Sequence, residues 1–169
     1  MESYTTDYTL ASEIIRRVLV SLFLGLIIGI ERSVAHRKIG FRTLSLVCVG
    51  STGFTLVSVY GFDDVDTSRV AAQIVTGIGF LGAGAIIHTT YATKGLTTAA
   101  ALWVAASVGM ACGTGMFILA GTMTVVSLIL LWLLKPFKKH INEIVDHEHK
   151  KNGHSKSHED EKHNGNDLI

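Results

Sequence analysis

The chain has 169 residues, of which 48% are hydrophobic, and its formal net charge is only +1. So small a net charge provides no basic stripe to neutralise phosphates, which argues against nucleic acid as a partner. The hydrophobic residues are concentrated between Val18 and Leu134, whereas Lys135–Ile169 is almost entirely polar and holds six of the eight histidines. This division indicates one membrane domain followed by a tail rather than one soluble domain.

The apolar region divides into stretches that can cross a bilayer as helices, which takes about 20 residues. Four spans are predicted at Thr43–Tyr60, Val70–His88, Thr97–Gly113 and Met116–Leu134. A fifth, Val18–Ile30, is long enough only if it extends back to Ile14. A signal peptide is the alternative for it, which the charges of Glu31 and Arg32 disfavour. We therefore predict an all-α integral membrane protein, a compact bundle of about five transmembrane helices with a disordered C-terminal tail.

The lysine and arginine residues predict how the helices are oriented. The first loop and the start of the tail are rich in these residues, whereas the second loop is acidic. Because positive loops stay in the cytoplasm, five spans place residues 1–13 outside, residues 14–134 in the membrane and residues 135–169 in the cytoplasm. Arg16 and Arg17 do not fit this pattern, since they lie near the predicted outer end.

Seventeen glycines are present, most of them in predicted spans. Helices in lipid associate through close backbone contact rather than hydrophobic force, so small residues mark contact surfaces. The third span is the richest in them, and we expect it to be the crowded centre, touching neighbouring helices or a second subunit. The same faces predict a homodimer. The candidate packing residues are Gly25, Gly29, Gly77, Gly79, Gly82, Gly84, Gly109 and Gly113.

Charged and polar groups at membrane depth are functional candidates, because they are costly there. Glu31 and Arg32 end the first span, and Arg42 lies at the start of the second on the same side. Arg42 is expected to pair with Glu31, either as a staple for the loop or as part of a ligand-contacting site. Thr43 begins the second span and completes this group. Gln73, in the third span, either joins neighbouring helices or offers its carbonyl to a hydrated cation.

The candidate metal ligands form two weak groups. Asp63, Asp64 and Asp66 on the second loop can attract Mg²⁺, although a solvated acidic loop needs no ligand. His147 and His149 belong to a histidine-bearing tract that can bind metal loosely, and such a tract also fits an ordinary charged tail. No cofactor is expected. No catalytic motif is present either, so we expect no enzyme activity.

Four segments of the apolar region form recognisable blocks. They are GLIIGIER at Gly25–Arg32, GFRT at Gly40–Thr43, AAQIVTGIGFLGAGAII at Ala71–Ile87 and GLTTAAALWVAASVG at Gly95–Gly109. In order and spacing they resemble the hallmark blocks of the MgtC/SapB family, over a region from Gly25 to about Leu134. The resemblance implies a multi-pass protein of the bacterial cytoplasmic membrane with four or five helices. The folded cytoplasmic regulatory domain of better-known relatives is not expected here, so its roles are not transferred.

The resemblance also carries an expectation about function. Family members are associated with growth under magnesium limitation and with survival inside host cells, and some resemble regulators that bind other membrane proteins. This favours a virulence-associated, non-enzymatic protein of magnesium homeostasis or low-magnesium stress adaptation, which acts through helix contacts with membrane partners. The alternative is a Mg²⁺ transporter or channel with Glu31, Arg42 and Gln73 along its route. Against it, we find no carboxylate at the predicted midplane, where ion ligands usually lie.

Overall fold

The computed structural model describes residues 2–37, 39–62, 66, 68–89 and 92–132. Contacts divide the chain into two units, Met1–Leu128 and Ile129–Ile169. Of the second unit only residues 129–132, the end of a helix, are described. The predicted disordered tail, residues 135–169, lies outside the described residues.

The first helix is much longer than its apolar stretch predicts. α1 (Glu2–Val34) has 33 residues and measures about 50 Å at 1.5 Å per residue. Residues 1–13, predicted as a short separate segment, are therefore helical from Glu2 onward. Their sequence is polar but holds neither glycine nor proline, so no helix breaker separates them from the apolar part.

Two helices match their predicted spans closely. α2 (Phe41–Tyr60) and α4 (Leu96–Gly113) are each long and apolar enough to cross a membrane. The remaining spans correspond to shorter helices, α3 (Ser68–Gly84) and Phe117–Trp132. The predicted helical fold class is confirmed, whereas five crossings of the membrane stay a prediction.

The third predicted span, Val70–His88, is wrong at its end, because α3 stops at Gly84 and a short hairpin follows. Its strands, β1 (Ile87–Thr89) and β2 (Ala92–Lys94), run antiparallel. Isoleucine and threonine favour extended backbone, which explains why the helix does not continue here. Gly95 closes the hairpin at φ 96°, and a Cβ there would overlap the backbone at the end of α3. Glycine alone adopts this conformation without strain.

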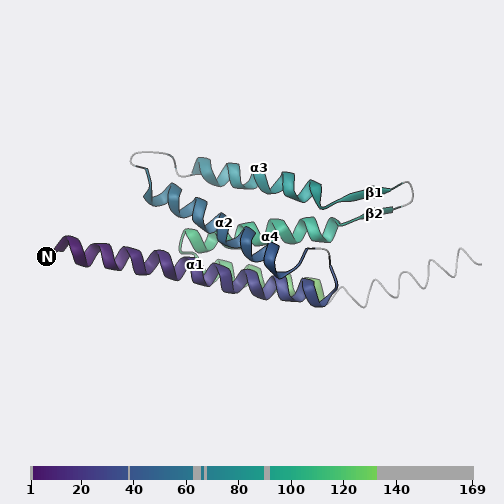
Figure 1. Ribbon diagram of the computed structural model, residues 1–169, viewed down its shortest axis with the longest axis horizontal. Helices are drawn as coiled ribbons and strands as arrows, with labels where there is room; N and C mark the ends of the chain where they lie inside the picture. Colours follow the sequence, from purple (N-terminus) through teal and green to yellow (C-terminus); the bar gives the residue numbers. More distant parts are fainter. Residues whose placement is uncertain (1, 38, 63–65, 67, 90–91, 133–169) are drawn as a thin grey trace, which may run out of the picture. The chain divides into compact units, whose positions relative to one another are not determined.

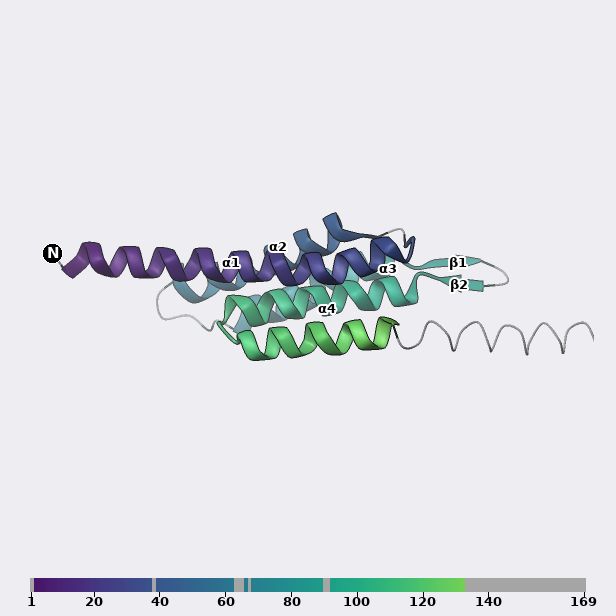
Figure 2. The same cartoon turned by 90° about the horizontal axis from the view of Figure 1, so that it is seen from below.

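Within Met1–Leu128, α2 packs on α1 and α4, and α4 also contacts α1 and α3 (Figures 1 and 2). Eleven of the 18 residues of α4 are buried, whereas only Ile78 and Gly82 are buried on α3. The expectation that the third span is the crowded centre is therefore wrong for contacts within this chain. The centre is α4, and α3 lies at the edge with most of its small residues uncovered.

Four glycines bring α1 and α4 close to α2. Gly25 and Gly29 lie on α1, and Gly109 and Gly113 lie on α4. A Cβ on Gly25 would lie 2.9 Å from the Cβ of Cys48, and one on Gly109 would overlap the carbonyl oxygen of Cys48. Backbones this close gain the van der Waals contact that holds helices together in lipid.

Buried hydroxyl groups join the same three helices. Thr52 Oγ1 lies 2.7 Å from Ser21 Oγ on α1 and 2.8 Å from the carbonyl oxygen of Gly109 on α4. The hydroxyl of Ser51 donates to the carbonyl oxygen of Ala106, at 2.7 Å. These bonds tie α2 to both neighbours at positions where each hydroxyl would otherwise be costly to bury.

Arg17 lies at the C-terminal end of α4, which explains one of the two arginines that did not fit the charge pattern. Its Nη1 donates to the carbonyl oxygen of Gly113 at 2.8 Å, and its guanidinium lies 5.6 Å from the ring centre of Tyr60. A cation at this end of a helix satisfies free carbonyl groups and complements the helix dipole. Arg16 lies nearby, over the ring of Phe117 at 4.9 Å.

Replacing Gly109 by valine tests the close contact between α2 and α4. The added side chain would overlap the backbone of α2, and overpacking of this kind costs about 1–3 kcal/mol. Thermal unfolding in detergent should therefore occur at a lower temperature. Gly121→Val is the matched control, because a Cβ at Gly121 meets no atom within 4 Å. An equal decrease of the unfolding temperature in both variants would contradict the assigned contact.

Replacing Thr52 by valine tests the hydroxyl contacts at nearly constant volume. The change removes the hydroxyl that bonds Ser21 and the carbonyl oxygen of Gly109, whereas Ser21 keeps its bond to Cys48. It should cost about 0.6 kcal/mol, the average for hydrogen bonds between membrane helices, and at most about 1.7 kcal/mol. The matched control is Thr122→Val, because the Thr122 hydroxyl bonds to Ile118 of its own helix and is exposed. The two variants are compared by unfolding in detergent. A Thr52 variant as stable as the control would show that the hydroxyl contacts contribute nothing.

Candidate functional site

Glu31 and Arg32 lie in the last turns of α1 with their side chains largely buried, 13% and 3% exposed. Arg32 Nη1 is 3.9 Å from Glu31 Oε2, a distance that allows an ion pair but no short hydrogen bond. Among the described residues, Nε and Nη2 of Arg32 have no hydrogen-bond partner. A guanidinium desolvated in this way is electrostatically costly, so the neighbouring carboxylate is needed to compensate for it.

Arg42 does not form the predicted pair with Glu31. It is exposed in the first turn of α2, and its guanidinium lies 5.8 Å from the ring centre of Phe41. Ser33 also holds the loop, since its hydroxyl oxygen accepts the backbone N–H of Phe41 at 3.1 Å. This contact keeps α1 and α2 close, and a staple role for Arg42 stays a prediction.

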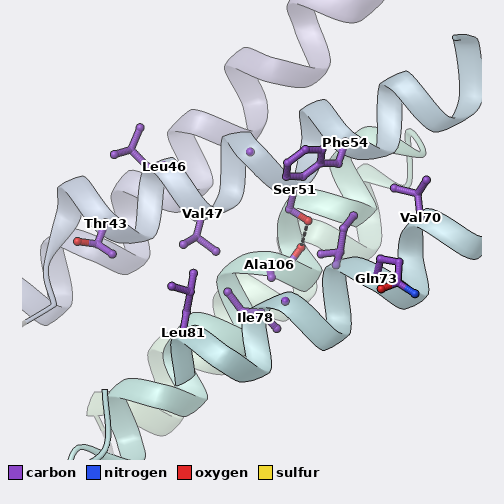
Figure 3. A pocket seen from close by; sticks show the side chains of 13 residues that line it. Thr43, Leu46, Val47, Ser51, Phe54, Val70, Gln73, Ile78, Leu81 and Ala106 are labelled. Atoms are coloured by element: carbon purple, nitrogen blue, oxygen red, sulfur yellow. Dashed lines mark hydrogen bonds between the residues drawn. The ribbon is translucent and has the colours of Figure 1, made fainter. Parts of the chain in front are cut away.

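A groove of about 610 Å³ runs between α2 and α3, with Ala106 of α4 at its floor. Figure 3 shows Thr43 and Leu46 at one end and Phe54 and Gln73 at the other. Its lining is mostly apolar. The groove exists because α2 and α3 make far less contact with each other than either makes with α4.

Two glycines keep this groove open. A Cβ on Gly50 or Gly77 would meet no atom within 4 Å, so larger side chains at these positions would project into empty space. The same is true of Gly79 and Gly84, which do not line the groove. The packing roles predicted for Gly77, Gly79 and Gly84 therefore stay predictions. Gly82, in contrast, lies against Ala99 and Trp103 of α4.

The predicted site residues do not meet at one point. Thr43 and Gln73 both line the groove, but at opposite ends. Glu31 and Arg32 belong to α1 and are not among its lining residues. Of the proposed cation route through Glu31, Arg42 and Gln73, only Gln73 lines this groove, so the route stays a prediction.

The metal candidates are only partly described. Asp63, Asp64, His147 and His149 lie outside the described residues. Asp66 accepts the backbone N–H of Ser68 at 2.9 Å and so begins α3. Hydrogen bonds from Ser68 and the nearby charge of Arg69 hold the pKa of Asp66 below its ordinary value. In the described part of the chain, no three His, Cys, Asp or Glu side chains form a group that could hold a metal ion.

The hydroxyl residues between the helices were missed by sequence reasoning, which searched for charges. The available signal was a cluster of hydroxyl residues, Ser51, Thr52 and Thr55, within an otherwise apolar span. All three are buried and bonded to backbone or side-chain oxygens. They form the polar interior of the unit, although nothing in their arrangement resembles a catalytic group.

Comparison with known proteins assigns the chain to a family. The MgtC family model matches residues 18–140, which include α2, α3 and α4 entirely. Protein MgtC of Brucella abortus (strain 2308) is 46% identical over 116 residues, which cover 69% of this chain and 49% of that protein.

Two further relatives agree with this match. Putative magnesium transporter YhiD of Escherichia coli (strain K12) is 44% identical over 129 residues, covering 72% of this chain and 60% of the relative. Protein MgtC of Salmonella typhimurium (strain 14028s / SGSC 2262) is 42% identical over 130 residues, which cover 77% of this chain and 56% of that protein. The chain spans about half the length of the curated relatives it matches. No solved structure matches it. By the family match and these identities, the chain is a membrane protein that belongs to the MgtC family.

Proposed function

We propose that this protein acts in magnesium homeostasis or low-magnesium stress adaptation, as a non-enzymatic protein that binds the helices of membrane partners. The relatives named MgtC and putative magnesium transporter support the connection with magnesium. The observation that carries partner binding is an uncovered face of α3, described next.

Small residues line the side of α3 that faces away from the groove. Ala72, Thr76, Gly79 and Ala83 follow one another at spacings of four, three and four, which places them on one face of the helix. We call them the small-residue face. A Cβ on Gly79 would meet no atom within 4 Å, and Phe80 beside it is 81% exposed. Such faces let a second helix approach closely in lipid.

Binding is favoured over transport by the character of the polar interior. A route for a cation needs oxygen ligands that are free to replace its water. The buried hydroxyls of Ser51 and Thr52 are instead bonded to carbonyl or hydroxyl oxygens of neighbouring helices. Moving them would break the contacts that hold α2 in place. Transport remains the second candidate because of the name of the E. coli relative.

The proposed orientation places the N-terminus outside and the C-terminus in the cytoplasm, in the bacterial cytoplasmic membrane. Arg37, Arg42 and Lys94 lie at the end of the helices where α1 ends and α2 begins, and Asp66 lies at the opposite end. The positive-inside rule puts the basic end in the cytoplasm. We call this end the basic end.

Gly79→Leu should abolish function without disturbing the fold. The leucine would occupy the small-residue face, and overpacking by about 1–3 kcal/mol weakens a helix contact about 5- to 150-fold. The measurement is growth at low Mg²⁺ of a bacterium that lacks its own family member and is rescued by this chain. Gly121→Leu is the matched control, since Gly121 is equally uncovered within the chain but lies outside α3. Rescue by the Gly79 variant would contradict the proposal.

A photo-crosslinking residue at Ala83 then separates two kinds of partner. Adducts with other membrane proteins that disappear in the Gly79→Leu variant support the proposed function. Adducts formed only between copies of this chain would instead mean that the small-residue face makes the homodimer, and partner binding through it would be wrong.

A further inference from the structure

The α2–α3 groove described above has the length of one leaflet. On α2 it extends from Thr43 to Phe54, and on α3 from Val70 to Leu81. Both distances correspond to about 17 Å at 1.5 Å per residue. One leaflet contributes about half of the roughly 30 Å hydrocarbon core. A transmembrane helix would need a groove about twice as long, whereas the length of this groove matches an acyl chain of one leaflet.

The lining of the groove suits a hydrocarbon chain. Leu46, Val47 and Phe54 on α2 and Ile74, Ile78 and Leu81 on α3 are among the lining residues, as are the open positions Gly50 and Gly77 (Figure 3). The hydroxyl of Ser51 is turned to the carbonyl oxygen of Ala106 at 2.7 Å, so it presents no free polar group to the groove. An acyl chain would bury apolar surface here without breaking the hydrogen bond of Ser51.

The groove begins at the N-terminus of α2, where the electrostatic environment favours a negative charge. Thr43 is in the first turn of α2, whose N-cap Gly40 makes no side-chain capping bond. That first turn contains no acidic residue and instead carries the exposed Arg42. The N–H of Phe41 in this turn is bonded to the hydroxyl oxygen of Ser33. The other first-turn N–H groups and the positive end of the helix dipole attract anions, whereas an arginine alone at this position is unfavourable.

Other charges at the basic end have the same sign, with one exception. Lys94 is exposed in β2, which lies beside the C-terminal end of α3, the same end of the groove as Thr43 (Figure 1). Arg37 follows α1, and Arg32 is buried beside Glu31. Glu31 is the one carboxylate among these described groups, and its ion pair with Arg32 offsets its charge.

We propose that the α2–α3 groove holds an acyl chain of an anionic phospholipid of the cytoplasmic leaflet, with the phosphate at the N-terminus of α2 beside Arg42. The site is independent of the proposed partner contact, because the small-residue face lies on the other side of α3. Gln73 does not oppose this assignment. Side chains tilt toward the N-terminus of their helix, so its amide is directed toward the start of α3 and the opposite interface.

The test uses the full chain in detergent and measures retained lipid by native mass spectrometry. The probes are phosphatidylglycerol and phosphatidylcholine with identical acyl chains. We expect phosphatidylglycerol to be retained preferentially. Arg42→Gln should reduce that preference about fivefold, because each basic group near an anionic membrane surface contributes about 1 kcal/mol of attraction. Arg69→Gln, which removes an exposed arginine at the opposite end of α3, should leave it unchanged.

Filling the groove tests the acyl chain separately from the charge. Gly77→Leu should reduce retention of phosphatidylglycerol, and Gly121→Leu should not, although both positions are open within the chain. Inorganic phosphate should displace little lipid, since it has no acyl chain to fill the groove.

Four outcomes would overturn the proposal. They are equal retention of both lipids, an unchanged Gly77→Leu variant, full displacement by inorganic phosphate, and protein adducts from a photo-crosslinker at Leu46. The last would mean that a helix of a partner or a second copy fills the groove.

Discussion

The structure depends on how closely the backbone of α2 approaches α1 and α4. In lipid, apolar side chains gain little from facing each other rather than acyl chains, so helices must gain contact at short range. Gly25 and Gly109 allow this approach, because a side chain at either would run into Cys48. Ser21 and Thr52 can bond across the helices only because the backbones are so near. Packing and hydrogen bonding are thus two results of one geometry.

This arrangement leaves α3 with a different role. The helix touches α4 through Ile78 and Gly82 but is separated from α2 by an apolar groove. Among the described helices it also has the most glycines at which an added Cβ would meet no atom within 4 Å. A helix that stability alone had shaped would not need so many, since each glycine costs about 1 kcal/mol relative to alanine in a helix interior. The uncovered surfaces of α3 are therefore where binding to lipid and protein is most reasonably sought.

Much of this fold can be predicted from the sequence, but the pairing of surfaces cannot. Hydropathy located α2 and α4 to within two residues, because each is an apolar segment bounded by glycine. Hydropathy missed the first half of α1, because that half is helical but too polar to be recognised as a membrane span. Counting glycines made the third span the centre, yet composition does not say which glycine faces a neighbour. A Cβ on Gly109 would overlap α2, whereas one on Gly77 would meet no atom of the described residues within 4 Å, and only coordinates distinguish them.

The candidate site shows the same limit. The search for charged and strongly polar side chains selected Glu31, Arg42 and Gln73, which lie apart, and it overlooked the buried hydroxyls because each is unremarkable alone. The central claim is that this interior is a fixed scaffold for binding and not a path for ions. It is tested most directly by Mg²⁺ flux into sealed proteoliposomes that contain folded, inserted protein. The account predicts no flux above that of empty vesicles. Saturable flux that falls in a Gln73→Ala variant would contradict it and establish a transporter.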